Sequence, residues 1–306
     1  MDRFATIRRR LLLAAAAPWA GAAAGGCARP LPLDAQPAPS EAAARRLRDC
    51  AAAHGLDAFA RIADVNVSYD GAWRPLIGRL QPELVDAGYR GASQERLLPA
   101  QGVVAQSHVG PRGRKHVFWR RGAGGAQPGE IAVWRDGTPD GRAAALDAAA
   151  LVAEGYGLFL LGPLWLAGRG LPAQLDGTAR VDGRACDVVS VWTRPGLGRV
   201  AQDRVALYVD RADSVMRRVR FTLEGFGPTR GAVAQVDHFE HARAGGVLWP
   251  VRSYEELVRP FPLPVHDWAV TGLDLDRGWG VEAVRGPALT GAAAPAAAPL
   301  GKSPGA

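Results

Sequence analysis

Lysine is almost absent from this 306-residue chain: Lys115 and Lys302 are its two lysines, and arginine supplies the rest of its 37 basic residues. The formal net charge is +7, but the arginines are scattered through the sequence and form no extended basic run. Residues 1–27 carry about three of the positive charges, so that removal of this segment leaves roughly +4. The charge pattern therefore argues against nucleic-acid binding.

Cysteine is also scarce, with only Cys27, Cys50 and Cys186. If Cys27 is modified, Cys50 and Cys186 are the one pair that could form an internal disulfide in an oxidising compartment. Two separate buried thiols are the alternative. Three cysteines at this spacing build no metal framework, and we expect neither a metal nor a cofactor.

The sequence lacks recognisable catalytic signatures. It contains no Gly-x-Ser-x-Gly elbow, no His-Glu-x-x-His, no Walker sequence and no dinucleotide fingerprint. His238 and His241 stand three positions apart, which on a strand directs them to opposite faces unless a turn intervenes. We therefore expect a protein that is not an enzyme. A hydrolase that uses His238 or His241 is the weaker alternative.

No apolar run in the chain is long enough to read as a transmembrane helix. Arg8-Arg9-Arg10 precedes a short apolar stretch, 11–17, and small residues then lead to Cys27. This pattern predicts an export signal over 1–27. Residues 22–27 resemble a bacterial lipoprotein signal, which implies lipidation of Cys27, and Ala22-Ala23-Ala24 as an ordinary signal-peptidase site is the alternative. Secretory and twin-arginine export both fit the arginines. Residues 28–40 are rich in proline and alanine and are expected to form a tether.

Alternating strands dominate the rest of the chain. Residues 181–224 predict three successive antiparallel strands, in which Val205, Leu207 and Val209 share one face. Other short strands follow one another with turn signals such as Asp136-Gly137 roughly every ten residues. We also expect strands over 73–80 and 84–89. Six tryptophans fall in predicted strands: Trp73, Trp119, Trp134, Trp192, Trp249 and Trp268.

Two segments have helical composition. Ser40 is a candidate N-cap for a helix over 42–53, which Gly55 should end. Residues 143–172 form a helical insertion, and 155–166 are its most apolar part. Their role is either a helix and loop packed in the core or a lid over an apolar cavity. Residues 284–306 are mostly alanine, proline and glycine and are expected to be disordered.

The order of these features resembles the periplasmic lipoprotein-carrier superfamily typified by LolA and LolB. The shared features are an export signal, an N-terminal helix, long antiparallel strands and a mid-chain helical insertion. Two short sequences near the end of the domain are also similar: the turn at Tyr208-Val209-Asp210 and the segment Gly245-Gly246-Val247-Leu248-Trp249-Pro250. The resemblance covers about residues 45–280 and is architectural. It implies an α+β fold that is mainly β, with a curved antiparallel sheet forming an incomplete barrel and helices on or in its concave side.

We therefore expect a single half-barrel domain over 41–283 that binds a lipid, acyl chain or other apolar ligand without catalysis. The protein should lie at the periplasmic face of a bacterial membrane, anchored by lipid at Cys27. An envelope structural or assembly protein that binds a protein partner through its sheet is the alternative. The predicted ligand-binding residues are Leu158, Phe159, Leu160, Leu164, Trp165, Trp192 and Phe221.

Overall fold

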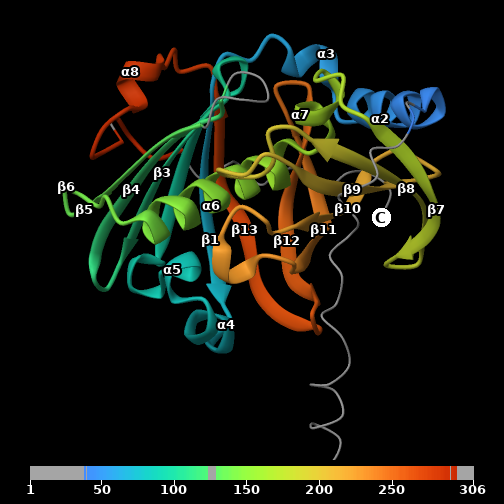
Figure 1. Cartoon of the computed structure of the whole chain (residues 1–306). Coiled ribbons are helices and arrows are strands. Elements are labelled where there is room, and N and C mark those ends of the chain that lie inside the picture. Colours follow the sequence, from blue (N-terminus) through green and yellow to red (C-terminus); the bar gives the residue numbers. More distant parts are fainter. Residues whose placement is uncertain (1–37, 39, 123–128, 290, 295–306) are drawn as a thin grey trace, which may run out of the picture.

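One continuous antiparallel sheet forms the body of the protein in the computed structural model, which describes residues 38, 40–122, 129–289 and 291–294. The predicted signal, Cys27, almost all of the tether and the end of the predicted tail lie outside these residues. The sheet has 13 strands in the order β6-β5-β4-β3-β2-β1-β13-β12-β11-β10-β9-β8-β7. It is not closed, because within the described ranges β6 and β7 have no pairing partner on their outer sides. The predicted fold class, an incomplete barrel with helices on its concave side, is confirmed (Figure 1).

Two meanders make up this sheet and meet where β1 pairs with β13. The first contains β1 (Val65–Trp73), β2 (Ala92–Leu98), β3 (Val103–Gly110), β4 (Gly113–Arg120), β5 (Glu130–Arg135) and β6 (Thr138–Pro139). The second contains β7 (Ala173–Val181), β8 (Arg184–Thr193), β9 (Asp203–Asp210), β10 (Met216–Thr222), β11 (Val233–Ala244), β12 (Val247–Arg259) and β13 (Leu263–Leu275). All six tryptophans predicted to lie in strands do so.

Helices α6 (Ala143–Leu161) and α7 (Pro163–Ala167) connect the two edges of the sheet and pass through its concavity (Figure 1). By length and composition α6 could cross a membrane, but 78% of its apolar window is buried inside the protein. Its side chains join the main core with inward residues such as Val67, Val104 and Leu207. The helical insertion is therefore a core element.

Shorter helices close the ends of the half-barrel. α2 (Glu41–Ala53) begins as predicted at Ser40, whose Oγ accepts a hydrogen bond from the Ala43 amide at 3.2 Å. α3 (Leu56–Phe59) follows Gly55, whose φ of +93° favours glycine. α4 (Pro75–Leu80), α5 (Pro82–Val85), and the 3₁₀ turn η1 (Ala87–Tyr89) lie at the opposite end. Two further 3₁₀ turns are η2 (Pro99–Gln101) and η3 (Gly227–Thr229).

The expected strands over 73–80 and 84–89 are wrong beyond Trp73, because α4, α5 and η1 occupy these positions. Pro75 and Pro82 each stand at the first position of a short helix, where a missing backbone N–H has no cost and φ is already helical. These two prolines indicate helix starts, but the alternation of apolar residues led us to predict strands.

The convex face is also partly buried. Tyr208 and Val188 form a small outer cluster with Cys186, and the guanidinium groups of Arg218 and Arg220 lie over the Tyr208 ring. On the other half of the sheet, α8 (Val281–Val284) packs against Phe118 and its neighbours. Arginine and the C-terminal segment thus cover apolar residues that a strictly one-sided sheet would expose.

Candidate functional site

An apolar pocket of about 280 Å³ opens between the helices at one end of the half-barrel and the strands of its second meander. Helices α4, α5 and α6 form one wall, and β10 to β13 form the other. Its volume is slightly below the range of roughly 300–1,000 Å³ that is usual for small-molecule sites. The concavity is therefore not completely filled by the protein's own side chains.

The mouth of this pocket carries exposed apolar side chains. Leu80, at the end of α4, is 51% exposed, and Phe261, in the turn between β12 and β13, is 53% exposed. Leu76, one turn before Leu80, is also exposed. Deeper in the pocket Phe159, Phe221 and Leu223 are buried. An apolar molecule can therefore contact protein continuously from the lip to the interior.

The helical wall is fixed to the strands by its own small core. Ile77 of α4 and Val85 of α5 pack with Val265 of β13. Leu84 faces the pocket from the same wall. Pro75 and Pro82 start these short helices, so the two turns that build the wall follow directly from local sequence.

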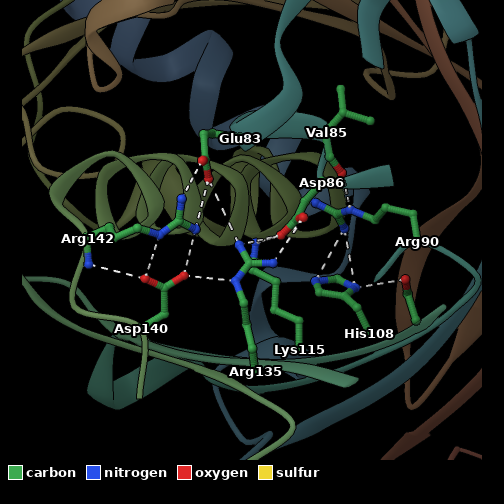
Figure 2. A network of polar contacts seen from close by, with 10 residues as sticks. Glu83, Val85, Asp86, Arg90, His108, Lys115, Arg135, Asp140 and Arg142 are labelled. Atoms are coloured by element: carbon green, nitrogen blue, oxygen red, sulfur yellow. Dashed lines mark hydrogen bonds and ion pairs between the residues drawn. The ribbon is translucent and has the colours of Figure 1, made fainter. Parts of the chain in front are cut away.

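A network of charged side chains holds α5 against β4 and β5 (Figure 2). Asp86 follows α5 and receives Lys115 Nζ at 2.8 Å and Arg135 at 2.9 Å. Burial lowers the pKa of Lys115 to about 8, although Asp86 partly offsets this effect. Arg135 also contacts Asp140 at 2.8 Å. Because these charges are paired and largely buried, they position the helical wall and are not free to bind a ligand.

A second branch of the same network, drawn in Figure 2, reaches the pocket wall through Arg90. Arg90 Nε donates to the carbonyl of Val85 at 2.9 Å, and its Nη1 lies 3.3 Å from the His108 ring. The guanidinium also lies over the Trp73 ring, 5.3 Å from its centroid. Burial, and then the positive charge of Arg90, lower the pKa of His108 well below its ordinary value.

Aromatic and titratable side chains gather on one side of the pocket, where Trp73 and Tyr156 also line a small second hollow together with His266 and Trp268. The His266 ring stacks between Trp73 and Trp268, with centroid distances of 4.2 and 4.7 Å. The Tyr156 hydroxyl of α6 lies 3.3 Å from His266 Nδ1. Glu255 of β12 is opposite His266 in the strand register and lines the pocket. Burial raises the pKa of Glu255 to about 8, and the charge of Arg90 partly offsets this rise.

Two of the predicted ligand-binding residues, Phe159 and Phe221, line this pocket, and their rings contact each other at 5.2 Å between centroids.

The other predicted residues do not line it. Leu158, Leu160 and Leu164 are buried in the main core. Trp165 packs beneath the guanidinium of Arg121, 3.8 Å away. Trp192 lies on the convex side of β8, because it is four positions from Val188 of the outer cluster and therefore shares its face of the strand. The guanidinium of Arg204 lies over the Trp192 ring.

Sequence reasoning missed the α4–α5 wall and the β12–β13 hairpin, which supply much of the pocket. The adjacent residues Glu255 and Glu256 do indicate a polar group in the interior. Neighbouring residues on a strand face opposite sides, so one of the two glutamates must face inward. Glu256 accepts a hydrogen bond from Gln235 on the outer face. Glu255 is the inward one.

His238 and His241 lie closer together than their spacing predicts. Irregularities in the β11 register between His238 and His241 bring the two rings to 6.2 Å between centroids. A bulge therefore brings the two histidines together, where we had expected that only a turn could do so. His238 Nδ1 shares a hydrogen bond with Ser253 Oγ at 2.9 Å.

The same histidines do not form a metal site with other groups. Within the described part of the chain, no three His, Cys, Asp or Glu side chains gather as a metal ion requires. His54 joins the two histidines from the end of α2 and accepts the Met216 amide at its Nε2. Burial lowers the pKa of His54 to about 4 and that of His241 to about 3. Cys50 and Cys186 are free, buried thiols.

No protein-family model matches the chain, and no curated protein matches its sequence. Among solved structures, a DUF1329 family protein from Desulfovibrio piger is 13% identical and has a TM-score of 0.51, with 83% of this chain and 100% of that chain covered. A LolA superfamily protein from Nitrosomonas europaea is 13% identical and has a TM-score of 0.38, with coverages of 75% and 93%. The first of these matches shows a likeness of fold alone, and it agrees with the open antiparallel half-barrel that the sequence predicted.

Proposed function

We propose that this protein is a non-catalytic cell-envelope protein that holds the acyl chain of a lipid in the pocket of its half-barrel. The observation that carries the proposal is the pocket of about 280 Å³, lined mainly by apolar side chains and open at Leu80 and Phe261. A completely packed interior would instead favour a structural protein that binds a partner through its sheet. That alternative remains a prediction, with the unpaired β7 edge as its surface.

Burial of an acyl chain supplies the binding energy. Each CH₂ group removed from water contributes about 0.8 kcal/mol. Ten such groups contribute roughly 8 kcal/mol before the entropic costs of association. Affinities in the micromolar range or weaker therefore fit a single chain in a pocket of this size.

The proposed location rests on the N-terminal sequence. Arg8-Arg9-Arg10, the apolar stretch 11–17 and Cys27 support export, followed by lipid anchoring at the periplasmic face of a bacterial membrane. An anchored carrier would keep its pocket near the membrane from which an acyl chain is taken.

Native mass spectrometry after incubation with decanoate tests the binding function. We expect one bound molecule on the wild-type protein and loss of binding in Ala232→Trp or Leu84→Trp, because both positions line the pocket and the new ring fills it. Leu175→Trp on the exposed edge strand β7 is the matched control and should bind like the wild type. Absence of uptake by the wild type, or equal uptake by all variants, contradicts the proposal.

A further inference from the structure

Glu255 differs from every other buried carboxylate in the described residues, because no protein group forms a hydrogen bond or ion pair with it. It is 9% exposed and lies on the pocket wall. The other buried carboxylates all have partners: Asp64 with Asn66, Asp86 with Lys115, Glu95 with Gln106, Glu154 with Arg121, Asp203 with Thr222, and Asp210 with Arg184.

An unpartnered carboxyl in an apolar wall is unfavourable in either protonation state. The ionised form loses its hydration, and the neutral form still has one O–H donor and its acceptor sites unused. Buried polar groups in folded proteins almost always have partners. Since the protein supplies none to Glu255, the geometry leaves this role to a molecule in the pocket.

The surroundings of Glu255 select the kind of partner. The guanidinium of Arg90 lies over Trp73, which lines the pocket, 5.3 Å from the ring centroid. Tyr156 also lines the pocket, and His266 is opposite Glu255 in the strand register. A cationic head would face Arg90, and an anionic head would bring a second acid against Glu255. A hydroxyl carries no charge and can both donate and accept, so it complements the carboxyl whether or not that group is protonated.

We propose that the ligand is an amphiphile that enters head first and places a neutral hydroxyl against Glu255, with its apolar chain between α4 and the β12–β13 hairpin. Glu255 lies four residues before the end of β12 at Arg259, which is about 13 Å of strand at roughly 3.3 Å per residue. The chain then leaves the pocket past Leu80 and Phe261. This inference rests on the proposed function, because it specifies the head group of the same ligand.

Two isomers of equal size separate the head-group contact from simple apolar burial. 1-Decanol has a hydroxyl, whereas 1-methoxynonane has the same atoms but no hydrogen-bond donor. We expect isothermal titration calorimetry on the purified full chain to show about tenfold tighter binding of 1-decanol, the usual effect of one hydrogen bond to a buried group. Decylamine and decanoate should bind more weakly than 1-decanol.

Variants assign the preference to Glu255. Glu255→Leu should bind both isomers equally, while Glu255→Gln, whose amide also donates and accepts, should retain a preference for 1-decanol. If the wild type binds neither isomer, the ligand pocket itself is refuted. If it binds both equally, the pocket stands and the role of Glu255 is refuted. Tighter binding of decylamine or decanoate overturns the neutral head group, and this comparison needs no variant to fold.

Discussion

The stability of the protein should depend on the protonation of Glu255, and Glu255→Gln isolates that dependence. The folded protein keeps the Glu255 proton up to about pH 8, whereas an unfolded chain releases it near the ordinary value of 4.5. Between these values the folded state binds more protons than the unfolded state. The contribution of Glu255 to the free energy of unfolding is therefore fully present below pH 4.5 and is lost as the pH rises toward 8.

The difference between these pKa values sets the magnitude. At about 1.36 kcal/mol per pKa unit, it corresponds to a ceiling of roughly 5 kcal/mol. Because Glu255 lines a pocket that water can enter, relaxation reduces this figure, and we expect about 2–3 kcal/mol. Glutamine has the same shape and stays neutral, so Glu255→Gln should match the wild type near pH 5 and exceed its stability by that amount near pH 9.

Urea denaturation from pH 5 to pH 9 measures this difference. The difference between variant and wild type is the quantity to follow, since it cancels the titration of Glu95, whose pKa burial also raises to about 8. Glu282→Gln, at a side chain that is 84% exposed, is the matched control and should give a flat difference. A constant difference for Glu255→Gln across the whole range would refute the reasoning.

Three further predictions concern the network of Figure 2, the buried histidines and the N-terminus. Asp86→Ala leaves Lys115 without its partner and should lower the free energy of unfolding by about 3–5 kcal/mol in urea. Asp86→Leu combined with Lys115→Met should recover most of this loss; no recovery would contradict the pairing. Acidification from pH 6.5 toward 4 should destabilise the protein, because unfolding lets His241 take up a proton that the fold excludes. His241→Asn should reduce this loss by roughly 1.4 kcal/mol per pH unit, and an unchanged pH profile of thermal melting would count against it. Cys27→Ala should release the protein from membranes on fractionation, and unchanged fractionation would remove the lipid anchor from the proposal.

Local patterns in the sequence were enough to predict the class of fold. Alternation of Val205, Leu207 and Val209 defined a strand with an inward face, and these residues do pack in the main core. Ser40 and Gly55 marked the limits of the N-terminal helix. Such signals depend on the backbone geometry of a few neighbouring residues, and therefore hold without knowledge of the rest of the chain.

Only the tertiary structure decided which of these elements build the pocket. Trp192 and Phe159 were equally apolar candidates, but β8 directs Trp192 outward while α6 directs Phe159 into the pocket. The surroundings of Glu255 include Arg90, which follows η1, Tyr156 of α6 and His266 of β13, and Arg90 and Tyr156 are distant from Glu255 in the sequence. Composition and periodicity thus determined a mainly antiparallel β protein with a mid-chain helical insertion. The pocket and its polar side depend on packing between residues far apart in the chain, which no local period encodes.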